Sequence, residues 1–133
     1  MEIPKAEDLQ VFSVSSPEQF RDLALRVFLF QYYNNPLYQQ YCKLLKTDPR
    51  TVSAVEQIPF LPISFFKTQQ VATTVYKPEL IFESSGTTGS ATSRHYIKDV
   101  GLYRKSFMEC FLRFYGSPRD YCILGLLPSY LDR

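Results

Sequence analysis

The feature that most constrains the fold is the junction at residues 80–89, where an apolar run changes abruptly into small polar residues. The run LIF at 80–82 predicts a short strand, and residues 83–90 then predict a loop rich in hydroxyl groups and glycine. Glycine lets a backbone turn with its N–H groups exposed, and such a concave loop can hold a polyphosphate. We therefore predict a phosphate loop whose binding residues are Ser84, Ser85, Gly86, Thr87, Thr88 and Gly89.

The predicted loop differs from the two common nucleotide motifs. A Walker loop carries a lysine directly after its second glycine, but Ser90 follows Gly89 here. A dinucleotide fingerprint has the order G-x-G-x-x-G, which this chain does not contain. A polar turn without a ligand is the alternative interpretation of any cluster of Ser, Thr and Gly.

The ordered string SSGTTG resembles the phosphate loop of the acyl-adenylate-forming enzymes. Those enzymes commonly continue with Pro-Lys-Gly, whereas this chain has ATS at 91–93, so Arg94 is the nearest cation that could contact a phosphate. The segments IPFLPISFFKT (58–68), FESSGTTGSATSRHYIKD (82–99) and LGLLPSYLDR (124–133) narrow the resemblance. Together they are similar to the acyl-protein synthetase of the bacterial luminescence fatty-acid reductase complex.

This resemblance implies an enzyme that activates a carboxylic acid, a fatty acid in this family, with ATP and Mg²⁺. The acyl-adenylate so formed passes its acyl group to a thiol, either a protein cysteine or coenzyme A. An aryl- or acyl-CoA ligase of the phenylacetate type shares SSGTTG and is the alternative within this chemistry. An alternative of another class is a non-catalytic interaction domain, in which the loop is a structural turn and the aromatic residues form a protein interface.

The ionisable side chains near the loop and the two lysines Lys67 and Lys98 are each assigned a predicted role. His95 is the single histidine, and it is the one candidate catalytic group because imidazole titrates near neutral pH; a structural role is the alternative. Glu83 adjoins the loop, and its carboxylate should point away from bound phosphates because like charges repel. Lys67 and Lys98 are interpreted as surface charges.

Composition excludes several other classes of protein. Fifteen basic and 13 acidic residues are interspersed and give a net charge of +2, without the clustered basic face that nucleic-acid binding requires. No run approaches the roughly 18 apolar residues of a membrane span, and no apolar signal segment follows Met1. Three widely spaced cysteines without C-x-x-C predict reduced thiols and no metal site. We therefore expect a cytoplasmic protein.

Residues 1–79 are predicted to form a helical amino-terminal region. Ser16-Pro17 is typical of a helix start, and the break at Asn34-Asn35-Pro36 favours two helices over one kinked helix. Pro59 and Pro62 exclude a central strand and an uninterrupted helix. Residues 58–67 are therefore predicted to be an apolar packing loop that ends in a short helical or extended piece.

Residues 80–133 are predicted to begin an α/β nucleotide-binding domain. The strand at 80–83 is followed by a returning strand at 93–98, a helix after Asp99 with an apolar stripe, and a buried strand at 121–127. This order predicts a partial βαβ unit of an adenylate-forming enzyme's large domain. Such enzymes are several times longer than this chain. The resemblance therefore implies that the chain is a fragment with an incomplete fold and that it is inactive by itself. We expect its uncovered residues 120–133 to cause self-association.

Overall fold

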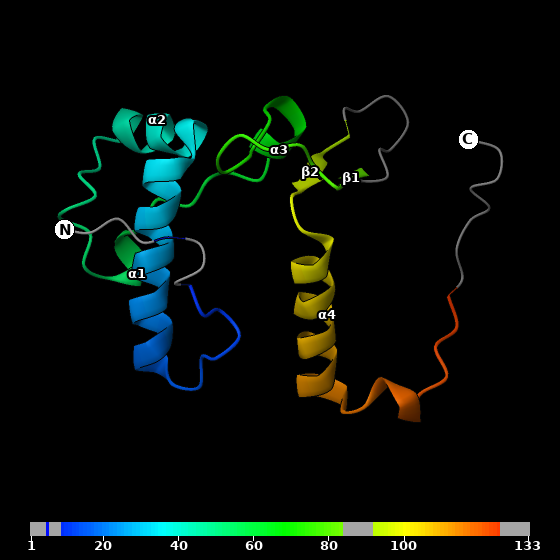
Figure 1. Cartoon of the computed structure of the whole chain (residues 1–133). Helices are drawn as coiled ribbons and strands as arrows, with labels where there is room; N and C mark the ends of the chain where they lie inside the picture. Colours follow the sequence, from blue (N-terminus) through cyan, green and yellow to red (C-terminus); the bar gives the residue numbers. More distant parts are fainter. Residues whose placement is uncertain (1–4, 6–8, 84–91, 126–133) are drawn as a thin grey trace. The chain divides into compact units, whose positions relative to one another are not determined.

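The computed structural model describes residue 5, residues 9–83 and residues 92–125 (Figure 1). The elements are α1 (Pro17–Asn34), α2 (Pro36–Leu44), the 3-10 helix η2 (Val55–Gln57), α3 (Phe65–Thr68), β1 (Leu80–Glu83), β2 (Arg94–Ile97), α4 (Val100–Tyr115) and the 3-10 helix η3 (Pro118–Asp120). Helices thus precede a small sheet and a further helix, which confirms the predicted α/β class in this coarse form. The chain divides into two compact units, residues 1–100 and residues 101–133.

Helix α1 begins where the sequence predicts. The side chain of Ser16 accepts a hydrogen bond from the backbone N–H of Gln19 at 3.2 Å, and Pro17 occupies the first turn. Proline suits this position because the first N–H groups of a helix have no intrahelical acceptor. The amide oxygen of Gln19 in turn accepts from the backbone N–H of Ser15 at 2.8 Å.

Asn35 separates the first two helices. Its backbone N–H donates to the carbonyl of Gln31 at 2.9 Å and closes α1, while its side chain accepts from the N–H of Tyr38 at 3.1 Å and opens α2. Pro36 lacks the N–H that would continue α1. Two helices therefore form here rather than one kinked helix.

The core of the first unit lies between α1 and α2. The ring centroids of Phe28 and Tyr38 are 6.2 Å apart in an edge-to-face arrangement, which the quadrupole of aromatic rings favours. Cys42 is fully buried, whereas Cys110 and Cys122, which also lie in apolar runs, are exposed. Burial raises the pKa of the Cys42 thiol. The buried hydrophobic side chains of this core are Phe28, Tyr32, Tyr38 and Cys42.

The proline-containing segment packs against this core. Ile58 and Leu61 are partly buried against it, and the phenol of Tyr38 donates to the carbonyl of Pro59 at 2.6 Å. The short piece that follows is helical, α3, rather than extended. Ile58 and Leu61 thus pack on the core, whereas Phe60 and Ile63 of the same segment are exposed.

Strands β1 and β2 form an antiparallel hairpin in which Leu80 pairs with Ile97 and Glu83 pairs with Arg94. The predicted returning strand is therefore confirmed. The parallel strand predicted at 121–127 is wrong over residues 121–125, which form no strand and are exposed; residues 126 and 127 lie outside the described part. The apolar run indicated a preference for burial, but a strand also needs a neighbouring strand as hydrogen-bonding partner. The βαβ unit is thus not formed over these residues.

In the second unit, aromatic side chains of α4 contact the segment that follows it. The ring centroids of Phe111 and Tyr121 lie 5.6 Å apart, and the phenol of Tyr121 donates to the carbonyl of Tyr115 at 2.6 Å. Gly116, with φ of +80°, ends the helix in the left-handed region that glycine tolerates. No residue of α4 is buried.

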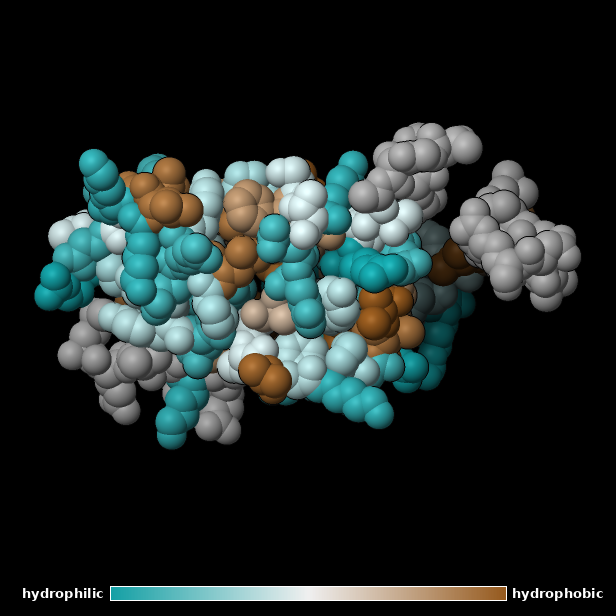
Figure 2. All heavy atoms as spheres, turned by 90° about the horizontal axis from the view of Figure 1, so that it is seen from above, coloured by the Kyte–Doolittle hydropathy of each residue, from teal (hydrophilic) through white to brown (hydrophobic). Residues whose placement is uncertain are grey.

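Apolar side chains also reach the surface, where Figure 2 shows brown apolar atoms between hydrophilic groups on the face in view. Ile63 and Leu124 are 82% and 87% exposed. Within the described residues, no helix combines the length and the apolar character required to cross a membrane.

Candidate phosphate-binding site

The predicted phosphate loop connects β1 to β2. Its residues Ser84, Ser85, Gly86, Thr87, Thr88 and Gly89 belong to the stretch 84–91, which lies outside the described residues. Both ends of the stretch are defined, because Glu83 closes β1 and Arg94 opens β2. These two residues are register partners, so the loop begins and ends at the same end of the hairpin.

An ion pair joins the two ends of the loop. The Nε atom of Arg94 lies 2.8 Å from Oε1 of Glu83, and the side chains are 59% and 53% exposed. The hydrogen bond that Arg94 donates to the Glu83 carboxylate raises the pKa of the Arg94 guanidinium. Exposed ion pairs contribute little to stability, so Arg94 can exchange this carboxylate for another anion at small cost.

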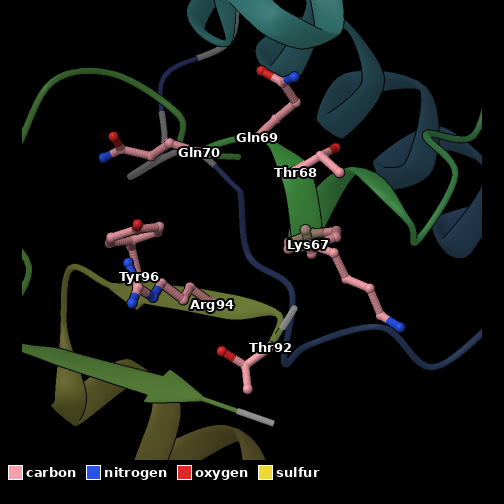
Figure 3. A pocket seen from close by; sticks show the side chains of 8 residues that line it. Lys67, Thr68, Gln69, Gln70, Thr92, Arg94 and Tyr96 are labelled. Carbon is pink, nitrogen blue, oxygen red and sulfur yellow. The ribbon is translucent and has the colours of Figure 1, made fainter. Parts of the chain in front are cut away.

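A hollow of about 410 Å³ lies beside β2 (Figure 3). Its volume is in the range of small-molecule sites. Among the described residues, the side chains that line it comprise two cations, two threonines, two amides and two aromatic rings, without a carboxylate. They are Lys67, Arg94, Thr68, Thr92, Gln69, Gln70, Phe66 and Tyr96.

Two separate segments form the walls of this hollow. Figure 3 shows Arg94 and Tyr96 on β2 and Thr92 just before the strand. The facing segment carries Lys67, Thr68, Gln69 and Gln70. In this view the ammonium group of Lys67 extends away from Arg94, so the two like charges do not face each other. The sequence interpretation of Lys67 as a plain surface charge did not anticipate its place here.

His95 packs against an aromatic ring. Its imidazole stacks on Phe66 with centroids 4.8 Å apart and an interplanar angle of 18°. Because side chains alternate along a strand, His95 lies on the opposite face of β2 from Arg94 and Tyr96. The stacking is compatible with the structural alternative for His95, and both that role and the catalytic one stay predictions.

The described lining of the hollow is suited to an anion. Lys67 and Arg94 supply positive charge, and the hydroxyls and amides supply hydrogen-bond donors to phosphate oxygens. Over residues 5, 9–83 and 92–125, no group of three His, Cys, Asp or Glu residues could hold a metal ion.

Sequence reasoning missed the four lining residues at 67–70, which precede the loop by many positions. Lys67, Thr68, Gln69 and Gln70 make up the stretch KTQQ at 67–70, which follows Phe65 and Phe66. The abrupt change to polar residues after an apolar segment was the available signal. It did not indicate which other segment these side chains would face.

Comparison with known proteins supports the resemblance carried by the loop and its neighbouring segments. No curated protein and no solved structure matches the chain. A family model described as "Acyl-protein synthetase, LuxE" matches residues 6–129, which is nearly the whole chain. The chain therefore belongs to the acyl-protein synthetase (LuxE) family.

Proposed function

We propose that this chain is part of an ATP-dependent acid–thiol ligase that activates a fatty acid and transfers the acyl group to a protein cysteine. Membership of the acyl-protein synthetase family supports a ligase that acylates a protein. The observation that carries the proposal further is the hollow lined by two cations beside the hairpin that holds the SSGTTG loop.

ATP contributes the leaving group in this proposal: a carboxylate oxygen attacks the α-phosphorus, an acyl-phosphate bond forms, and pyrophosphate departs. The hydroxyls and backbone N–H groups of residues 84–89 bind the β- and γ-phosphates and hold them in line for the attack. Arg94 leaves Glu83 and pairs with a phosphate oxygen. The acyl group then passes to a thiolate sulfur, and AMP departs with the electron pair of the broken bond.

We further propose that residues 1–79 form a helical amino-terminal region and that residues 80–133 begin the nucleotide-binding domain. The resemblance to adenylate-forming enzymes supports the further proposal that the metal ligands and the adenine pocket come from residues outside this chain. The chain alone is then one wall of the site. We expect the chain by itself to show no catalytic activity.

The test is isotopic ATP–pyrophosphate exchange with a panel of carboxylic acids, using the protein expressed from its complete reading frame. The proposal expects exchange that requires Mg²⁺ and a fatty acid. Absence of exchange with every acid, in a preparation whose folding is verified by circular dichroism, would refute it and leave the non-catalytic interaction domain.

The acceptor is tested separately with a radiolabelled fatty acid and ATP. Transfer to a protein, with label released by neutral hydroxylamine, identifies a protein thioester and supports acyl-protein synthesis. Transfer to coenzyme A alone identifies the alternative, a ligase of the phenylacetate type. In both outcomes the acid is activated with ATP. The outcomes differ in which thiol accepts the acyl group.

A further inference from the structure

We propose that residues 69–75, called the strap from here on, are a movable wall of the hollow beside β2. The structure holds the strap against α1, and the left-handed backbone of Thr74 keeps a released state close in free energy to this held state. The movement does not depend on which ligand the hollow takes, so it goes beyond the proposed function and is tested separately from it.

The middle of the strap is attached to the last turn of α1. The backbone N–H of Thr74 donates to the carbonyl of Asn34 at 2.8 Å, and the hydroxyl of Thr73 donates to the side-chain oxygen of Gln31 at 2.6 Å. Asn34 is the last residue of α1, and terminal carbonyls of this kind have no partner within their own helix. Two hydrogen bonds therefore hold the strap in place, and one of them also satisfies the end of the helix.

The backbone conformation of Thr74 opposes these bonds. Its φ is +66°, in the left-handed region where the β-carbon of an L-residue crowds the following carbonyl oxygen. A β-branched residue is an outlier there, and the cost is of the same order as the contribution of one or two hydrogen bonds. Strain and hydrogen bonding thus nearly cancel, so the held and released states are close in free energy.

The residues that follow Thr74 provide a pivot for the strap. Val75 is fully exposed, so its side chain loses no apolar burial when the strap moves. The phenol of Tyr76 donates to the carbonyl of Tyr96 on β2 at 2.8 Å, at a half-buried position, and the ammonium of Lys98 lies 5.9 Å from the centre of the Tyr76 ring. Tyr76 therefore stays on β2 while the strap turns about it.

Movement of the strap changes the hollow because the strap forms part of its wall. Gln69 and Gln70 line the hollow on the segment that faces β2 (Figure 3). In the held state the backbone N–H of Gln69 donates to the carbonyl of Phe65 at 2.7 Å. When Thr74 leaves α1, this bond is released as well, and the two amide side chains move away from β2. The held strap thus narrows the hollow, and the released strap opens it.

The experiment is hydrogen–deuterium exchange of single amides, resolved by fragmentation mass spectrometry, on the protein expressed from its complete reading frame. Under conditions where the rate reports the opening equilibrium, Thr74→Asn should slow exchange at position 74 by about threefold to tenfold after correction for intrinsic rates, because asparagine tolerates the left-handed region. Thr74→Val is the matched control, because it keeps the branched β-carbon, and it should change the rate less than about twofold. Thr73→Val removes the hydroxyl that bonds to Gln31 and should speed exchange by about twofold to tenfold.

Two further amides report how far the movement extends. The Gln69 amide should follow position 74, exchanging more slowly in Thr74→Asn and faster in Thr73→Val, because both belong to the strap. The Asn35 amide, which donates to the carbonyl of Gln31 at 2.9 Å, should be unchanged in every variant. This pattern would show that the strap opens while the helices stay folded.

Three results would overturn the movable wall. Equal exchange at position 74 in Thr74→Asn and Thr74→Val would show that backbone strain does not set the balance. A Gln69 amide that is unaffected by Thr74→Asn and Thr73→Val would confine the movement to the turn and leave the hollow unchanged. In the parent protein, exchange at position 74 as slow as at Asn35 would exclude a separate released state. None of these results bears on ATP–pyrophosphate exchange, which tests the proposed function.

Discussion

The hydroxyl of Tyr38 offers a sharp test of how the proline-containing segment is held. The side chain is 8% exposed, and its phenol donates to the carbonyl of Pro59 at 2.6 Å. Tyr41 makes a comparable bond to the carbonyl of Phe60, but at 3.3 Å and at an exposed position. Tyr38→Phe and Tyr41→Phe each remove one oxygen atom, so the pair compares a short, half-buried bond with a long, exposed one.

The expected loss of stability follows from the environment of the acceptor. Without the phenol, the Pro59 carbonyl loses its donor where water has limited access, so Tyr38→Phe should lower the free energy of unfolding by about 1–2 kcal/mol. The Phe60 carbonyl can turn to water, so Tyr41→Phe should cost less than about 0.5 kcal/mol. With a slope of about 1–3 kcal/mol per molar urea, Tyr38→Phe should lower the midpoint by roughly 0.3–2 M.

Urea unfolding followed by far-ultraviolet circular dichroism measures both variants against the parent chain, and equal slopes show that the difference lies in stability. The reasoning fails if the midpoint of Tyr38→Phe falls no further than that of Tyr41→Phe. Such a result would mean that apolar contacts alone hold residues 58–62 on the helices. The short hydrogen bond would then be a consequence of the packing.

Three further predictions concern pH, the loop and self-association. Burial is the main cause that raises the pKa of Tyr38, and burial also raises the pKa of the Cys42 thiol. As the pH rises, both groups therefore lose their protons in the unfolded chain before they do so in the folded chain. The free energy of unfolding should be constant at lower pH and should fall above about pH 9. Tyr38→Phe should make this fall shallower, and parallel curves for parent and variant would argue against it. Thr87→Val should weaken ATP use in exchange assays by roughly 1–3 kcal/mol with the fold retained, whereas unchanged exchange would exclude Thr87 from the site. The chain should self-associate through residues 120–133 in sedimentation runs at increasing concentration, more weakly after Leu124→Asp; a sharp monomer at high concentration contradicts this.

Local sequence signals predicted the elements that depend on neighbouring residues. Ser16-Pro17 defined the start of α1, and Asn35-Pro36 defined the end of α1 and the start of α2, because helix caps involve groups only a few positions apart. The hairpin of β1 and β2 was likewise readable from a short apolar run and its return. The SSGTTG string indicated the family, and the match over residues 6–129 confirms it.

Tertiary structure alone decided what depends on partners far along the chain. The apolar run at 121–125 predicted a buried strand but is exposed, because hydrophobicity does not supply the neighbouring strand that a sheet requires. Lys67 reads as a surface charge in the sequence, yet it lines the same hollow as Arg94. The packing of residues 58–68 on α2 and β2 brings these two cations close together. Their proximity cannot be predicted from spacing along the chain, because it results from contacts between segments that are far apart in the sequence.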